Sequence, residues 1–255
     1  MDLIEVSFSF LGLICVGIPI LGIILLLIYV VKKSRANQPK HVLEKEKREL
    51  ITKVRSKTNS LIDWQEDFIE QISNNIDYTY SKGYTMRFNG FINSLDGDKL
   101  IAYRRLDRGN FNTTTKIIAV SKGFEIYYSQ ENLDVSIFFH STFLGKLIQD
   151  NIYDDKNELI GNLNRNNNNQ AYYNIEFRKE KLAYVVKNTE RRTALKNPFF
   201  EFRPTSGLEV DPFWENPVSM SNTLRLYRKL SDYEYKWILA LALYENIYYG
   251  IDFTQ

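Results

Sequence analysis

Basic side chains crowd into one stretch of the chain, and the chemistry they offer is the binding of anionic groups. Residues 32–57 hold ten Lys and Arg residues against three Glu residues. Each Lys or Arg close to an anionic cytoplasmic leaflet contributes about 1 kcal/mol of attraction. The predicted lipid-binding residues are Lys32, Lys33, Arg35 and Lys40, which lie nearest to the apolar run over residues 8–31. The alternative is a solvated basic flank that only sets the orientation of a membrane segment.

The sequence offers little that is typical of catalysis or metal binding. It contains no phosphate-binding loop, no serine-hydrolase elbow and no zinc-protease motif. Of the two histidines, His41 lies in the basic stretch, and His140 ends a predicted strand and is expected to be structural. Cys15 is the one cysteine, so neither an intrachain disulfide nor a cysteine zinc site forms. We therefore predict no catalytic residue, no metal site and no cofactor.

The rest of the chain is not basic. Residues 58–255 hold 23 basic and 26 acidic residues, and nucleic-acid binding requires a basic domain, so no nucleic-acid partner is predicted. Two short basic clusters, RRLDR at 104–108 and ERR at 190–192, are interpreted as solvated surface groups.

An uncharged apolar run covers residues 8–31. Because about 20 apolar residues cross the hydrocarbon core, these 24 residues predict a transmembrane helix. A cleaved signal peptide is the alternative, but the segment before the run is acidic and Lys32 and Lys33 follow it directly. The positive-inside rule places the amino end outside and the large domain in the cytoplasm, which predicts a single-pass membrane protein.

The segment that follows has a helical period. Residues 41–76 lack Gly and Pro, and their apolar residues recur at intervals of four and seven. This pattern predicts a basic helical stalk, with Asn59 and Ser60 as a point where the helix breaks. A coiled-coil dimer is an alternative, although Lys47 and Lys57 fall on its seam.

From about residue 80 the period changes to two. Roughly eleven short segments alternate apolar and polar residues, which predicts an all-β domain of consecutive hairpins. Asp96-Gly97 is a typical hairpin turn. The segments are 84–93, 99–106, 115–123, 124–130, 133–139, 145–153, 158–165, 171–179, 181–188, 199–204 and 223–230.

The chain closes with an apolar helix. Ser231 and Glu234 have the spacing of a capping box, and the helix is expected to run from Tyr233 to Tyr249 with Gly250 as its C-cap. Its uninterrupted apolar part, residues 237–244, is too short to span a bilayer. A helix that is apolar on nearly all sides is buried, so we expect it inside a closed barrel. The rival architecture is an open β-sandwich with this helix across one face.

The order of these elements resembles the tubby C-terminal-like superfamily, which includes the LURP-one-related and phospholipid-scramblase-like proteins. The resemblance rests on the strands around LGKLIQDNIYDDKNELIGNL (144–163) and on the lead LSDYE into YKWILALALYENIYYGIDF. It implies a closed barrel of about twelve strands around a central hydrophobic C-terminal helix. The chain departs from the scramblase-like members because its apolar segment lies at the amino end.

We accordingly predict three parts: an anchor over residues 1–31, a basic juxtamembrane stalk over 32–79, and a β-barrel with a buried C-terminal helix over 80–255. The predicted function is that of a membrane-anchored module that binds lipid or protein at the inner leaflet, with no protein partner identified. Phospholipid translocation, implied by the scramblase-like relatives, and an enzyme with its site in a groove are the alternatives.

Overall fold

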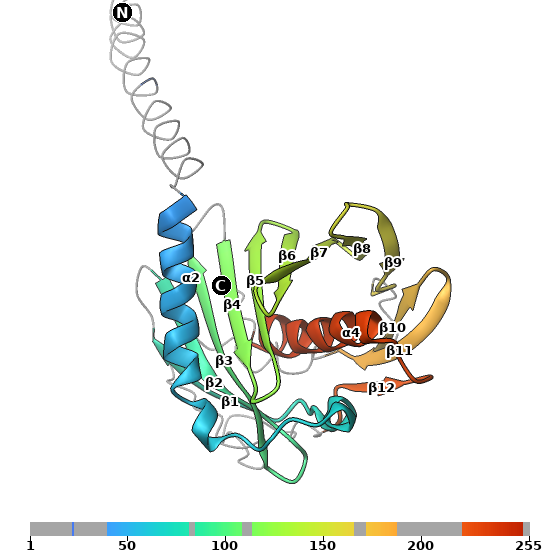
Figure 1. Ribbon diagram of the computed structural model, residues 1–255, viewed down its shortest axis with the longest axis horizontal. Helices are drawn as coiled ribbons and strands as arrows, with labels where there is room; N and C mark the ends of the chain where they lie inside the picture. The colour runs from blue at the N-terminus through green and yellow to red at the C-terminus, as the bar shows by residue number, and fades with distance from the viewer. Residues whose placement is uncertain are drawn as a thin grey trace, which may run out of the picture. The chain divides into compact units, whose positions relative to one another are not determined.

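The computed structural model describes residues 40–81, 85–108, 114–165, 172–187 and 221–251, together with Gly22 (Figure 1). The helices are α2 (Lys40–Arg55), the 3-10 turns η1 (Thr58–Ser60) and η2 (Glu66–Gln71), α4 (Asp232–Tyr244) and the π-helical turn η3 (Glu245–Tyr249). The strands are β1 (Ile76–Ser81), β2 (Thr85–Asn93), β3 (Lys99–Arg108), β4 (Thr114–Val120), β5 (Glu125–Glu131), β6 (Asp134–Phe139), β7 (Thr142–Ile148), β8 (Asn151–Asp154), β9 (Leu159–Asn162), β10 (Tyr172–Phe177), β11 (Glu180–Val186) and β12 (Leu224–Leu226).

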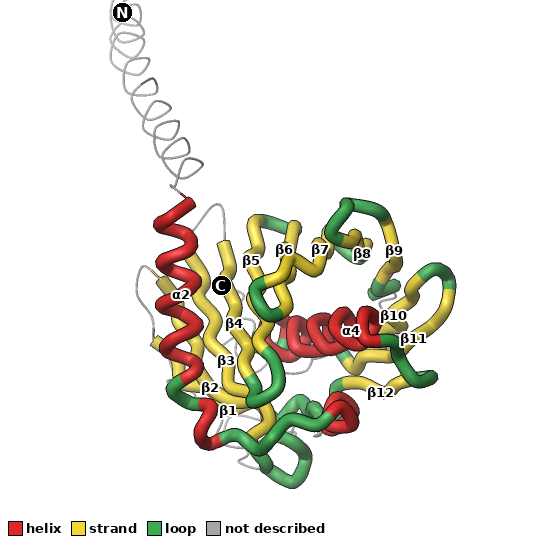
Figure 2. The backbone as a smooth tube through the Cα atoms, viewed as in Figure 1, coloured by secondary structure: helices red, strands yellow, loops and turns green. Residues whose placement is uncertain are grey.

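All twelve strands belong to one sheet, in which each strand pairs with its neighbour in the sequence. Every pairing is antiparallel, so the spatial order is β1 to β12 (Figure 2). The expectation of an all-β domain of consecutive hairpins is confirmed. Alternating residues of the strands form the large core cluster on the inner face, while the other face carries a second, smaller cluster.

The predicted strands match the observed ones with two exceptions. The segment 145–153 is divided between β7 and β8, which meet at a tight turn where Gln149 has a φ of 55°. Strand β1 matches none of the predicted strands, because the helical stalk was expected to reach residue 79. The predicted strand 199–204 lies outside the described residues.

The expectation that the barrel closes is wrong, because no ladder joins β1 to β12 in the part of the chain that the structure describes. The residues that approach β12 precede β1. Ser73 forms an isolated bridge with Asn222, and the Thr223 amide donates to the Ile72 carbonyl at 2.7 Å. Beyond this point the Leu226 amide donates to the Glu70 carboxylate, so a side chain takes the place of a partner strand. Strand β12 is only three residues long, and its ladder is formed with β11.

Helix α4 lies in the hollow of the curled sheet (Figure 1). Trp237 and Leu241 lie on one side of the helix and Leu239 on the opposite side, and all three are at most 1% exposed. Every residue from Trp237 to Tyr244 is buried. The prediction of a central buried helix is therefore confirmed, and a helix lying across one face of a sandwich is ruled out.

The sheet is shaped to accommodate this helix. Gly145 in β7 has a φ of 148°, and a Cβ there would lie 2.8 Å from the Trp237 ring and closer still to the Tyr153 carbonyl. A side chain at this position would displace either the helix or strand β8. From β5, the buried Tyr128 hydroxyl donates to the Ala240 carbonyl of α4 at 2.7 Å. Burial raises the pKa of Tyr128 well above its usual value, so this donor stays protonated.

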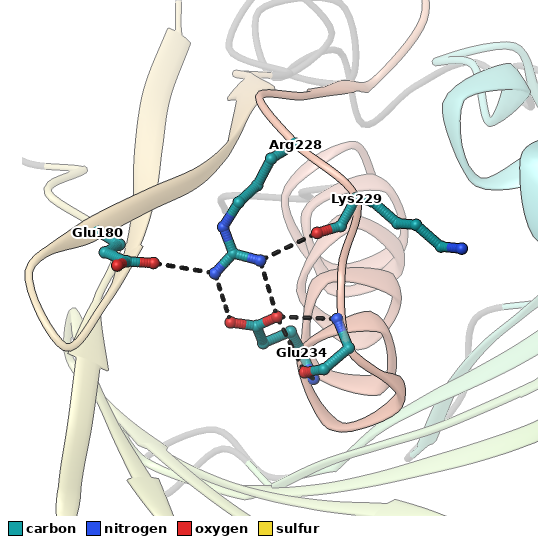
Figure 3. A network of polar contacts seen from close by, with 5 residues as sticks. Glu180, Arg228, Lys229 and Glu234 are labelled. Atoms are coloured by element: carbon teal, nitrogen blue, oxygen red, sulfur yellow. Dashed lines mark hydrogen bonds and ion pairs between the residues drawn. The ribbon is translucent and has the colours of Figure 1, made fainter.

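The start of α4 is fixed by the predicted capping box, which is confirmed. The Glu234 amide donates to the Ser231 hydroxyl, and the Ser231 amide donates to the Glu234 carboxylate. Arg228 donates to both carboxylate oxygens of Glu234 and to Glu180, as Figure 3 shows. The predicted C-cap, Gly250, ends the π-helical turn with a φ of −72°, so it adopts no left-handed conformation.

The predicted helix over residues 41–76 is wrong beyond Arg55. Three hydroxyl side chains there turn back onto carbonyls three residues earlier, a contact that competes with helical hydrogen bonding. They are Ser56 on Lys53, Thr58 on Arg55 and Ser60 on Lys57. The later apolar residues of the pattern, Phe68, Ile69, Ile72 and Ile76, pack into the sheet's core instead of onto a helical stripe.

The predicted transmembrane segment, residues 8–31, lies outside the described residues apart from Gly22. Among the residues that are described, no helix combines the length and the apolar character that a membrane span requires. The chain divides into two compact units, residues 1–49 and 50–255, and the second contains the whole sheet.

We predict that Leu239→Ala lowers the free energy of unfolding by about 2–5 kcal/mol, because it leaves a cavity between α4 and the sheet. Leu159 is 62% exposed and provides the same chemical change at the surface. Leu159→Ala should change stability by less than about 0.5 kcal/mol. Urea denaturation followed by tryptophan fluorescence measures both, and equal losses in the two variants would contradict the central position of α4.

We also predict an acid-sensitive start to this helix. Hydrogen bonding from Arg228 is the main cause that lowers the pKa of Glu234 from its usual 4.5 to about 2. Because the folded pKa lies below the unfolded one, this carboxylate stabilises the fold above pH 4.5, and the stabilisation is lost as the pH falls towards 2.

Thermal unfolding between pH 2 and pH 6 should therefore fall less steeply with acid in Glu234→Gln than in the parent chain. Glu180→Gln is the matched control, since the Glu180 side chain touches the same arginine but is 70% exposed. If Glu234→Gln keeps the parent's full pH dependence, the ion pair does not stabilise the helix start.

Candidate functional site

The four residues predicted to bind lipid fall at the edge of the description. Lys32, Lys33 and Arg35 lie outside the described residues. Lys40 is the first residue of α2, and its side chain is not described. That these four residues form one site therefore stays a prediction. The described part of the chain carries another basic surface, within residues 50–255.

The end of α2 is attached to the outer face of the sheet. Leu50, Ile51 and Val54 are buried against a cluster on β3, β4 and β5. The residues they cover are Ala102, Leu106, Ile118, Val120 and Tyr127. Arg55 donates twice to the Glu125 carboxylate, at 2.8 and 3.2 Å, which closes the edge of this contact. The end of the basic stalk is thereby held firmly on the domain.

Beside this attachment, basic side chains surround one aromatic ring on the same outer face. The Lys57 ammonium lies 5.5 Å and the Lys99 ammonium 4.6 Å from the centroid of the Phe91 ring. Lys57 follows the end of α2, Phe91 belongs to β2, and Lys99 begins β3. Cation–π attraction of this kind orients the two ammonium groups without neutralising them.

Two arginines extend this basic surface along β2 and β3. Arg104 lies opposite Asn89 in the register and Arg87 lies opposite Leu106, so the two arginines are diagonal neighbours on one face. Burial, and then the charge of Arg87, lowers the pKa of Arg104 below its usual value. Burial, and then the charge of Arg104, lowers the pKa of Lys57. The cations are therefore close enough to repel one another.

A second polar group lies at the carboxyl end of α4, inside the sheet. Arg105 forms a bidentate pair with Asp107, with Nε–Oδ1 at 3.0 Å and Nη2–Oδ2 at 2.9 Å. Its Nη1 donates to three backbone carbonyls at and just beyond the end of the helix, where intrahelical amide donors run out. These are the carbonyls of Ile247 at 3.0 Å, Tyr248 at 2.7 Å and Ile251 at 2.6 Å. Arg105 therefore acts as the cap of the central helix.

The same end holds a buried acid. Glu245 accepts from Arg165 at 3.1 Å and from the Tyr173 hydroxyl at 3.1 Å. Burial, and then the charge of Glu245, raises the pKa of Tyr173 well above its usual value, which keeps that hydroxyl a donor. The Arg165 guanidinium also lies 3.2 Å from the centroid of the Tyr249 ring. These contacts join the end of the helix to Arg165 and Tyr173, so this polar group stabilises the position of the helix inside the sheet.

His140, the histidine of the β-domain, occupies a turn. Its φ is 46°, its amide donates to the Glu125 carbonyl at 2.8 Å, and its ring meets the edge of Phe139. In the part of the chain that the structure describes, no three His, Cys, Asp or Glu side chains gather into a group suited to a metal ion.

Sequence reasoning missed the basic surface on the sheet and misread its neighbours. The cluster RRLDR was interpreted as solvated, yet Arg105 and Asp107 are buried and only Arg104 and Arg108 face outwards. Strict alternation along a strand assigns adjacent arginines to opposite faces and is the signal that separates them. The approach of Arg87 and Lys57 to Arg104 depends on strand register and on the end of α2, which no local pattern carries.

Comparison of the chain with protein-family models, with curated proteins and with solved structures gave no significant match.

We predict that Arg105→Leu destabilises the protein by about 3–5 kcal/mol, because it leaves Asp107 as a buried unpaired charge and uncaps α4. Arg225 is exposed on β12, so Arg225→Leu is the matched control and should change stability by less than about 0.5 kcal/mol. Chemical denaturation of both variants measures the difference. A loss in Arg105→Leu no larger than in the control would show that Arg105 does not cap the helix.

Proposed function

We propose that the protein is a single-pass, membrane-anchored binding module that holds a β-domain at the cytoplasmic leaflet. In this proposal the basic stalk, with Lys32, Lys33, Arg35 and Lys40, contacts anionic phospholipid headgroups. The domain then presents its own basic outer face to the same surface. The proposal assigns it no catalytic chemistry.

The observation that carries this proposal is the attachment of α2 to the outer face of the sheet. Leu50, Ile51 and Val54 bury one side of the helix end against the sheet, and the Arg55–Glu125 pair closes it. A flexible linker would let the domain drift from the membrane, whereas the packing of residues 50–55 on the sheet leaves only residues 32–49 between the predicted anchor and the packed domain. The fold thus favours a function exercised close to the end of the stalk.

The charge of the outer face supports the same function. Lys57, Lys99, Arg87 and Arg104 lie together beside α2, so the surface next to the stalk is basic as well. Each basic residue near an anionic leaflet adds about 1 kcal/mol of attraction, so the attraction of the sheet face adds to that of the stalk. On β10 and β11 the exposed residues are Tyr172, Glu180 and Lys181, in which one basic side chain stands beside an acid, so these strands offer no comparable attraction.

We also propose membership of the tubby C-terminal-like superfamily. Twelve consecutive antiparallel strands curled around a buried C-terminal helix support this assignment. Among the described residues no ladder joins β1 to β12, and this is the point on which the chain departs from the closed barrel of that superfamily.

The lipid-binding function is tested by energy transfer in reconstituted vesicles. The full-length chain is placed in phosphatidylcholine vesicles containing a trace of dansyl-labelled phosphatidylserine or dansyl-labelled phosphatidylcholine. We expect greater transfer from the chain's tryptophans to the labelled phosphatidylserine, and we expect this excess to vanish in 0.5 M NaCl, where the Debye length falls below about 5 Å. The combined substitution Lys32→Glu, Lys33→Glu, Arg35→Glu and Lys40→Glu should abolish it.

A matched variant controls for net charge. Lys156→Glu, Lys179→Glu, Lys181→Glu and Lys229→Glu reverse four exposed lysines away from the stalk and should preserve the excess. An excess that survives the stalk reversal, or that is insensitive to salt, would refute the proposed reading of anionic lipid.

A further inference from the structure

Three cations on the outer face of the sheet lack an acidic partner. Among the described residues, no carboxylate forms an ion pair with Lys57, Arg87 or Arg104. The nearest acids on this face are engaged elsewhere, since Glu125 binds Arg55 and Asp77 accepts from the Asn93 amide. The contrast with the inner face is plain, because Arg105 and Arg165 each have a carboxylate there.

The arrangement also leaves a donor without an acceptor. The Nε atom of Arg104 is buried, and none of the described residues offers it a hydrogen-bond partner. A buried donor without a partner loses its hydrogen bonds to water and gains none from the protein, which is unfavourable. Neighbouring like charges add electrostatic repulsion. The lowered pKa values of Arg104 and Lys57 have the same origin. Strand register and the end of α2 thus bring three cations to one face around a donor that has no partner among the described residues, which is the arrangement expected when a ligand supplies the missing negative charge.

We propose that Lys57, Arg87 and Arg104 form a binding site for a phosphomonoester dianion. The two guanidinium groups project from adjacent strands on one face and offer fork-shaped pairs of donors that match phosphate oxygens. Lys57 adds a point charge from the end of α2, and its position over the Phe91 ring limits where its ammonium group lies. Asn89, opposite Arg104 in the register, places an amide beside the same point.

This site is more specific than the attraction proposed for the stalk. A stalk of many lysines responds to the total charge of a surface, whereas three donors gathered on one face of the sheet respond to a compact group of charge about −2. The phosphate has two potential sources, a lipid headgroup that bears a phosphomonoester or a soluble phosphorylated molecule. The site deepens the proposed function if the source is a headgroup, and it stands without that function if the source is soluble.

The test uses the full-length chain in nanodiscs of phosphatidylcholine. Inorganic phosphate is titrated by calorimetry while NaCl keeps the ionic strength constant. We expect saturable binding of one phosphate, weakened at least about tenfold in Arg104→Gln and in Arg87→Gln, because each loses charge-assisted hydrogen bonds. Lys156→Gln, an exposed lysine on the turn between β8 and β9, should bind like the parent.

Thermal stability separates a ligand site from a structural role. Arg104→Gln removes a like charge from the cluster, so its melting temperature without phosphate should equal or exceed that of the parent. Added phosphate should raise the melting temperature of the parent and leave that of the variant unchanged. A variant that melts well below the parent, or that binds phosphate as the parent does, would overturn the site, as would the absence of saturable binding by the parent.

The source is found by changing the disc lipid. Phosphatidic acid presents a phosphomonoester, whereas phosphatidylserine presents a phosphodiester. Phosphatidic acid that blocks the calorimetric signal identifies a headgroup as the source, and a signal that persists in both discs identifies a soluble phosphate. Failure of the stalk function is distinguishable, because the stalk reversal should abolish the excess transfer to phosphatidylserine while preserving phosphate binding.

Discussion

The apolar character of α4 on all its sides is the constraint on which the rest of the fold depends. A helix that is apolar on one stripe needs one covering layer, but beyond its polar first turn this helix is apolar and buried on every side, from Trp237 to Tyr244. The sheet satisfies the requirement by curling around it, with Gly145 making space for Trp237. A helix also ends in carbonyls that lack intrahelical donors, and Arg105 of β3 donates hydrogen bonds to the carbonyls at the end of this one. The ladder need not close for this purpose, since the bridge at Ser73 and Asn222 covers the remaining gap.

The same strand separates a structural charge from a candidate binding charge. Arg104 and Arg105 are adjacent in β3, and the pleat sends them to opposite faces. Inside, Arg105 is neutralised by Asp107 and fully bonded, so its charge serves the helix end. Outside, Arg104 is half-buried beside Arg87 and Lys57, and no acid in the described part of the chain pairs with it. The interior thus explains why the fold is stable, and the outer face next to α2 explains where an anionic ligand has a place.

Sequence patterns predicted the elements whose signals are local. The alternation of residues gave most strands, and the spacing of Ser231 and Glu234 gave the start of α4. The helix over residues 41–76 was wrong because Ile72 and Ile76 fit a helical stripe equally well, and only contact with the sheet draws them into its core. The prediction of a closed barrel was wrong for a related reason. The length of β12 and the groups that lie beside it are set by tertiary contacts, which a local pattern does not contain. The basic surface depends on the register of β2 and β3, which brings Arg87 and Arg104 together and leaves no trace in either strand alone.

The central claim is that α4 forms part of the core and opens only when the domain unfolds. Native-state hydrogen exchange of the α4 backbone amides tests it most directly. If the account is right, the amides of residues 237–244 exchange with a free energy equal to that of global unfolding, and this free energy falls in parallel with global stability as denaturant is added. If those amides exchange at a lower free energy that denaturant barely changes, α4 opens on its own, and the sheet does not depend on the helix at its centre.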